Sequence, residues 1–237
     1  TAYLQQQFIN LENSLSLSSK LSFLTALDNF YIELENTYSV AQLYTNIHPN
    51  ADIRSSASEC QETINSLVTD VSLSQAIYQQ LQQIDSSNSD TITQRYHKKL
   101  LTDFTRSGVD KDQQQREKLR QLHIDIANLG QQFSKNIRED VRHITIDNIE
   151  QLNGLPQDYI NSLDKNANGQ WLITTDYPSI FPFLRYAQDD AKRLAIYTLF
   201  LNRGYPDNEA LLKQIISKRH QLATSLAYDN YADYVTE

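Results

Sequence analysis

The chain has 237 residues and a formal net charge of −8, with one cysteine, five glycines and five prolines. The acidic balance argues against a nucleic-acid partner, because binding to a phosphate backbone needs clustered Lys and Arg side chains. A single cysteine excludes an internal disulfide framework, no apolar stretch reaches the roughly 18 residues of a membrane helix, and so few turn-forming residues favour long helices.

The first predicted elements are two long helices. Apolar residues three or four apart predict an amphipathic helix over residues 18–45, and Pro49-Asn50 is expected to end it. Asn50 would then cap a second helix, in which Cys60 is interpreted as a small buried side chain rather than a nucleophile. The predicted buried stripes are Leu21, Leu24, Tyr31, Leu34, Tyr38 and Ala41 in the first helix, and Ile53, Ala57, Cys60, Ile64 and Leu67 in the second.

Three further helices are expected before the pattern changes. A short one covers about residues 74–84, and Asp90 would cap the next, which Gly108 ends. Asp110, followed three residues later by Gln113, would start the longest helix, over about residues 111–140. The predicted stripes are Ile92, Tyr96, Leu100 and Phe104, then Leu119, Leu122, Ile126, Leu129, Phe133 and Ile137.

At Val141 the apolar period changes from about 3.6 residues to 2. Residues 142–147 and 170–175 are therefore predicted to pair as one small antiparallel ribbon. Between them, Leu155-Pro156 marks a helix start and residues 164–169 a polar return turn. After the ribbon, Ser179 is expected to cap a helix and to place Pro182 in its first turn.

The last predicted helices lie on either side of a break at residues 203–206. The first covers about residues 189–201, and Asp207 would cap the second. The second is predicted to bury Leu212, Ile215, Leu222 and Leu226. The expected fold class is mainly α: a multi-helix domain with long antiparallel helices and one two-stranded ribbon.

The residues do not predict a catalytic site, a cofactor site or a metal site. The histidines are dispersed, with no two standing three to five residues apart as on a zinc-binding helix, so each is interpreted as a surface or capping residue. The adjacent acids are interpreted as solvated helix ends, Ser179 as a cap, and the basic run as a solvated face. The residues considered are His48, His97, His123, His143 and His220, Glu139-Asp140, Asp189-Asp190, Ser179 and Lys218-Arg219-His220.

An aromatic cluster is open to two interpretations. Its side chains could line a peptide groove, but core packing is favoured, because aromatic residues supply much of the buried area of a domain. The cluster consists of Tyr177, Phe181, Phe183 and Tyr186.

Ordered segments of the chain resemble the M3 family of zinc metallopeptidases, which includes thimet oligopeptidase and oligopeptidase A. The similar segments lie in the same order along the chain. They are His48-Pro49-Asn50-Ala51-Asp52-Ile53-Arg54, Arg106-Ser107-Gly108-Val109, Phe133-Ser134-Lys135-Asn136, Gly154-Leu155-Pro156, Trp171 to Ser179, Arg203-Gly204-Tyr205-Pro206-Asp207-Asn208, Lys218 to Ala223 and Ala227 to Ala232.

The resemblance implies a zinc-dependent oligopeptidase whose helical N-terminal region forms one wall of a deep substrate channel. Residues 1–237 would be that wall, with residues from about 190 to 237 leading into a C-terminal catalytic region. The family's His-Glu-x-x-His motif is not in the sequence, so the resemblance assigns no zinc ligand and no catalytic residue to this chain. The chain alone is therefore expected to be inactive and to bind no cofactor, whereas the complete enzyme would bind zinc.

The resemblance also implies partners and a compartment. Short peptides and the C-terminal catalytic region would be the partners, with neither nucleic acid nor membrane, and the cytoplasm would be the compartment. A periplasmic or exported form is the alternative. A different class of function stays open: a stand-alone helical adaptor that binds proteins without catalysis.

Overall fold

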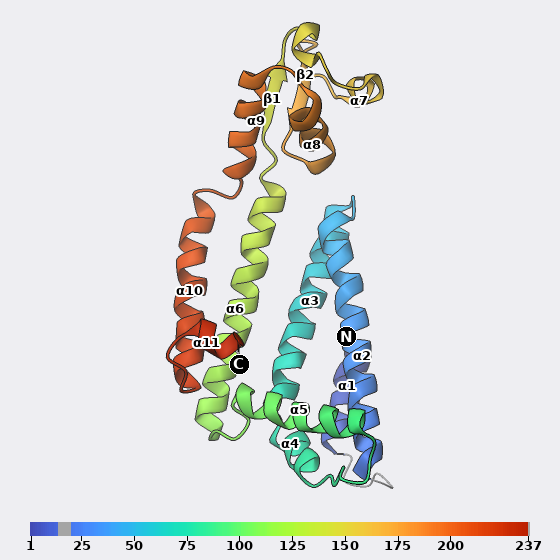
Figure 1. Cartoon of the computed structure of the whole chain (residues 1–237), viewed down its shortest axis with the longest axis vertical. Coiled ribbons are helices and arrows are strands. Elements are labelled where there is room, and N and C mark those ends of the chain that lie inside the picture. Colours follow the sequence, from blue (N-terminus) through green and yellow to red (C-terminus); the bar gives the residue numbers. More distant parts are fainter. Residues whose placement is uncertain (14–19, 237) are drawn as a thin grey trace. The chain divides into compact units, whose positions relative to one another are not determined.

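The computed structural model describes residues 1–13 and 20–236. It is mainly α, as predicted, with one two-stranded antiparallel sheet in the described part. The chain divides into two compact units, which are described separately below (Figure 1). The first unit contains Thr1–Gln131 and Gln214–Glu237, and the second contains Gln132–Lys213.

The first unit consists of helices. The predicted caps Asn50 and Asp90 are confirmed, because the side chain of each accepts backbone N–H groups of the following helix. Ser74, predicted to lie inside the short helix, is in fact its cap and accepts the Ile77 N–H. The first helix of the chain is not predicted from the sequence. The helices are α1 (Ala2–Glu12), α2 (Lys20–Ile47), α3 (Ala51–Ser72), α4 (Gln75–Gln82), α5 (Thr91–Ser107), α6 (Gln113–Glu139, shared with the second unit), α10 (Asp207–Ser225, also shared) and α11 (Tyr231–Thr236).

The main core of the first unit is formed by side chains of the five helices from α1 to α5. α2 packs along α3 in this core, and Leu24, Leu34 and Leu67 of the predicted stripes are buried. Three predicted core residues are instead exposed: Leu21, Ile53 and Ile92. Each lies in the first turn of its helix.

Helix α6 begins two residues later than predicted. Gly108 ends α5 in a left-handed conformation with φ 88°, and a turn bond from the Lys111 N–H to the Gly108 carbonyl follows. The cap is therefore Asp112, whose Oδ1 accepts the Gln115 N–H at 2.8 Å, and not Asp110. Predicted residues 18 and 19 of the first long helix lie outside the described residues.

The second unit is built around the predicted ribbon. β1 (His143–Ile146) pairs antiparallel with β2 (Trp171–Thr174), so that Ile144 lies opposite Ile173. Isoleucines of both strands join a core with the helices that follow. These elements are the 3-10 turn η1 (Ile149–Leu152), which is not predicted from the sequence, and α7 (Gln157–Ser162), α8 (Tyr177–Tyr186) and α9 (Asp190–Leu201).

The prediction that Ser179 caps α8 is wrong. The Asp176 carbonyl accepts the N–H groups of Ser179 and Ile180 at 2.9 and 2.8 Å, so the helix begins earlier and Pro182 lies inside it. The Ser179 hydroxyl oxygen instead accepts the Thr174 N–H at 2.9 Å. Ser179 therefore joins the end of β2 to the first turn of α8.

The last predicted helix forms with two differences. α10 begins at Asp207, which is its first residue rather than its cap, and Leu212 is 47% exposed instead of buried. Ile215, Leu222 and Leu226 are buried as predicted. Within the described ranges, no helix is both long enough and apolar enough to cross a membrane.

Candidate functional site

The histidines do not meet in the structure. His97 is buried, and its Nε2 lies 2.8 Å from the Leu81 carbonyl oxygen, which can only accept, so its Nδ1 accepts from the Ser86 hydroxyl at 3.0 Å. His97 is thus a core residue, which corrects its interpretation as a surface or capping residue. His48 does serve in a cap, because its Nδ1 accepts the Asn50 N–H.

The positions of the possible ligand side chains show whether the described residues could bind a catalytic zinc ion. A catalytic zinc needs about three protein ligands, usually His with a carboxylate or Cys. In the part of the chain that the structure describes, no three His, Cys, Asp or Glu side chains come close enough to hold a metal ion. The described side chains therefore do not fit a catalytic zinc. Burial lowers the pKa of His123, whose buried Nε2 has no hydrogen-bond partner among the described residues.

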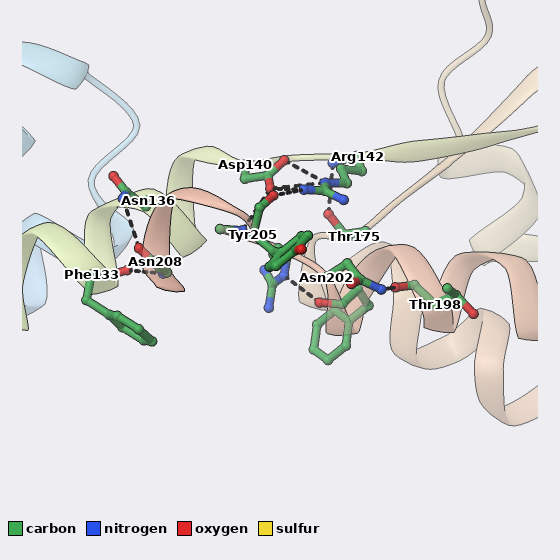
Figure 2. A network of polar contacts seen from close by, with 12 residues as sticks. Phe133, Asn136, Asp140, Arg142, Thr175, Thr198, Asn202, Tyr205 and Asn208 are labelled. Carbon is green, nitrogen blue, oxygen red and sulfur yellow. Dashed lines mark hydrogen bonds and ion pairs between the residues drawn. The ribbon is translucent and has the colours of Figure 1, made fainter. Parts of the chain in front are cut away.

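The main polar network of the second unit is centred on Asp140. Arg142 donates to both carboxylate oxygens, from Nε at 2.9 and 3.0 Å and from Nη2 at 2.6 Å, and the Gly204 N–H donates to Oδ2 at 2.8 Å. Arg142 also donates to the Tyr205 carbonyl at 3.1 Å. Figure 2 shows Asp140 and Arg142 facing each other next to Tyr205. The interpretation of Asp140 as a solvated helix end is therefore wrong.

The same loop is tied to α6 by a buried amide. Asn208 donates to the Phe133 carbonyl at 3.0 Å and accepts from Asn136 at 2.9 Å (Figure 2). Its own N–H donates to the Gly204 carbonyl at 2.8 Å. These hydrogen bonds hold the end of α6, β1 and the start of α10 together, so the network is interpreted as a structural joint.

Asp140 should contribute to stability in a pH-dependent way. The hydrogen bonds from Arg142, followed by that from Gly204, lower the pKa of Asp140 below its usual value of 3.8. A lowered pKa in the folded state means that the contribution is fully present above the unfolded-state pKa and is lost as pH falls through the folded-state value. We expect Asp140→Ala to cost about 1.5–3 kcal/mol at neutral pH, with a difference from the native chain that decreases as the pH falls through the folded-state pKa of Asp140.

Urea unfolding, followed by the fluorescence of the only tryptophan, Trp171, measures this effect, since Trp171 packs against the core of the second unit. Asp140→Asn serves as the control, because it keeps the shape but cannot titrate. A loss for Asp140→Ala that stays constant from neutral pH to the acid limit of the folded state, and that Asp140→Asn does not share, would show that the carboxylate charge has no part in stability.

The other sequence-predicted groups are separated from this network or serve as local structure. Asp189 caps α9 by accepting the Lys192 N–H, and Asp190 is exposed at the start of that helix. Lys218 is not simply solvated, because it makes a 2.6 Å ion pair with Asp125 in the first unit. Arg219 lies 5.1 Å from the ring centroid of Tyr231.

The aromatic residues divide between core and surface. Phe183 is fully buried, as the core interpretation requires, but Tyr177, Phe181 and Tyr186 are 59%, 50% and 45% exposed. Tyr177 and Phe181 contact Phe200 of α9, a neighbour that the sequence reasoning missed. Sequence spacing offers no signal for that contact, because Phe200 comes 19 residues after Phe181 in another helix.

An apolar groove lies on the first unit between α2 and α3. It has a volume of about 560 Å³, and no charged residue lines it. Cys60 lies in this groove and also packs against the core, so it is partly buried rather than enclosed. The lining residues are Asn36, Thr37, Val40, Ala41, Tyr44, Ile53, Ser56, Ala57 and Cys60.

Comparison with known proteins gives relatives that include several oligopeptidases. The thimet-like oligopeptidase of Dictyostelium discoideum is 26% identical over 218 residues, which cover 88% of this chain and 32% of the relative. Saccharolysin of Saccharomyces cerevisiae is 28% identical over 225 residues, 90% of this chain and 31% of the relative. Oligopeptidase A of Salmonella typhimurium is 27% identical over 146 residues, which cover 56% of this chain and 22% of the relative. No family model matches the chain.

These homologues are oligopeptidases of the M3 family, in agreement with the resemblance seen in the sequence. The chain spans about a third of the length of the first two and about a fifth of the third. The homology supports a peptidase-related region, and it includes the segment of the Asp140 network.

Proposed function

We propose that the chain is the non-catalytic N-terminal region of a zinc-dependent oligopeptidase and forms one wall of its substrate channel. The observation that supports this most is the pair of coverages, about nine tenths of this chain against about a third of each of two oligopeptidases. The remaining two thirds of such a protein would carry the zinc site. Cytoplasmic location remains part of this proposal.

The role of the chain would be steric. Long helices such as α2, α3 and α6 are rigid elements that could admit short, unfolded peptides to the channel and exclude folded proteins. A zinc-bound water elsewhere in the protein would attack the scissile carbonyl.

An exposed apolar stripe supports contact with the rest of such a protein. Leu194, Tyr197 and Leu201 of α9 are 66%, 45% and 62% exposed, and their spacing of three and four residues puts them on one face of the helix. This face is directed away from Ile196, which is fully buried in the core. Exposed apolar patches of this kind mark interaction surfaces.

The second candidate function is an adaptor without catalysis, and the uncharged groove between α2 and α3 favours it. Such a groove could receive an apolar helix of a protein partner. The reading frame of the gene beyond residue 237 distinguishes the two functions, because only the oligopeptidase requires a His-Glu-x-x-His segment downstream.

A direct test compares residues 1–237 with the complete product of the same reading frame. We expect the 237-residue chain to retain no stoichiometric zinc after dialysis and to cleave no internally quenched peptide, because the metal ligands would be elsewhere. The complete product should bind zinc and lose activity to a chelator. Chelator-sensitive cleavage by the 237-residue chain, or a complete product without zinc and without cleavage, would contradict the proposal.

A further inference from the structure

Four side chains of the second unit form an arginine–aromatic cluster: Tyr177 and Phe181 of α8, Phe200 of α9, and Arg203 just after α9. The three rings form a triangle, with centroids 5.1 Å apart for Tyr177 and Phe181, 5.9 Å for Tyr177 and Phe200, and 6.0 Å for Phe181 and Phe200. These are the separations of directly interacting rings, so each ring restricts the others.

The cluster is open to solvent although it is largely apolar. Tyr177 is 59% exposed and Phe181 is 50% exposed, and Phe200 and Arg203 are partly buried. Aromatic residues and arginine are the residue types most enriched in binding surfaces, where they supply a large contact area for a small loss of side-chain freedom. An ordered, exposed group of three rings with an arginine is therefore suited to binding.

Arg203 is held in place by the rings. Its guanidinium carbon lies 4.2 Å from the ring centroid of Phe200 and 5.7 Å from that of Tyr177, and its Nε donates to the Phe200 carbonyl at 3.3 Å. No carboxylate among the described residues lies within ion-pair distance of it. A stacked guanidinium loses little freedom when its terminal N–H groups bind an anion.

The neighbouring acid does not compensate this charge. The positive charge of Arg203 helps to lower the pKa of Asp140, but the carboxylate oxygens of Asp140 already accept hydrogen bonds from Arg142 and from the Gly204 N–H. Asp140, Arg142 and Arg203 together carry one excess positive charge. A guanidinium can bind a carboxylate through two parallel hydrogen bonds, and the apolar rings beside Arg203 suit a ligand that carries an apolar group next to its carboxylate.

We propose that the arginine–aromatic cluster binds a peptide through a carboxylate held by Arg203 and an adjacent bulky apolar side chain packed on Tyr177 and Phe181. The carboxylate can be the C-terminus of the peptide or an Asp or Glu side chain. This inference rests on the proposed function, since it assigns to the second unit a contact with the peptides that the complete enzyme would cleave.

Titration calorimetry of the 237-residue chain with three probes tests the proposal. The probes are acetyl-Gly-Gly-Phe with a free carboxylate, the same peptide as an amide, and acetyl-Glu-Phe amide. We expect the free acid to bind about tenfold or more tighter than its amide, because a hydrogen-bonded charge contributes about 1.5–3 kcal/mol. Tight binding of the acetyl-Glu-Phe amide as well would identify a side-chain carboxylate as a second source.

Variants with a matched control assign the binding to this cluster. Arg203→Gln should weaken the free acid about tenfold and abolish the difference between acid and amide, and Phe181→Ala should weaken acid and amide alike. The control is Arg185→Gln, because Arg185 also lies over an exposed ring, 5.4 Å from the centroid of Tyr186, but outside the triangle. It should leave the affinities unchanged, and Trp171 fluorescence checks the fold of each variant.

Three results would overturn the proposal: equal affinities for acid and amide, equal effects of Arg203→Gln and Arg185→Gln, or binding by the 237-residue chain that disappears in the complete protein. The last result would mean that the remainder of the polypeptide covers the cluster. None of these results touches the proposed function, which is judged by zinc content and cleavage in the complete protein.

Discussion

Gly154→Ala should destabilise the second unit by about 2–5 kcal/mol. Gly154 has φ 89°, a conformation that costs a residue with a side chain about 1–2 kcal/mol. A Cβ at this position would also lie 2.2 Å from the Tyr186 carbonyl oxygen, which is backbone at the end of α8 and cannot rotate away. The Gln188 N–H donates to the Asn153 carbonyl beside it, so moving the two segments apart would break that bond as well.

Gly169→Ala is the matched control. Gly169 has a similar φ of 78°, but no atom lies within 4 Å of the position that a Cβ would take, so this variant pays the backbone strain alone. We expect a loss of about 1–2 kcal/mol. Urea unfolding followed by Trp171 fluorescence measures both. If the two variants lose the same stability, the close approach of residue 154 to Tyr186 is relieved at no cost, and the argument from packing fails.

Local features of the fold could be predicted because they depend on neighbouring residues. The caps Asn50 and Asp90, the end of α5 at Gly108 and the pairing of β1 with β2 each follow from a few adjacent side chains or from the local period. The predicted cap of α6 is wrong because a turn forms in the same segment. Asp112 replaces Asp110 because the turn after Gly108 occupies the residues in between.

Contacts between distant residues could not be predicted in this way. The Gly204 N–H that binds Asp140 comes 64 residues later, and the Lys218 that pairs with Asp125 comes 93 residues later. Period and composition do not carry that information. For the same reason the sequence indicates only two members of the arginine–aromatic cluster, Tyr177 and Phe181. Phe200 and Arg203 belong to a later helix and loop, and the local spacing of residues does not predict their contacts with these rings.

Several residues that carry the family resemblance have structural tasks. Arg54 donates to the carbonyls of His48 and Pro49 and so fixes the turn before α3. Gly154 permits a close backbone approach, and Asn208 joins α6 to α10 within the second unit. These segments of the resemblance therefore correspond to turns and joints of the fold.

Phe104→Ala should cost the first unit about 3–5 kcal/mol, the usual loss for a buried phenylalanine. Phe104 of α5 is 2% exposed in the core, and its ring stacks on Tyr78 at a centroid distance of 6.2 Å. Truncation removes the buried area and leaves a cavity among residues from several helices. Urea unfolding followed by far-UV circular dichroism measures the loss.

Ile92→Ala is the decisive comparison, because the sequence places Ile92 and Phe104 on the same stripe. In the structure Ile92 is 80% exposed in the first turn of α5, whereas Phe104, near the other end of the helix, is 2% exposed. Its truncation should change stability by no more than about 0.5 kcal/mol, since alanine is also the better helix former. A loss of several kcal/mol for Ile92→Ala would mean that the stripe is buried over its whole length and that α5 packs as the period alone predicts.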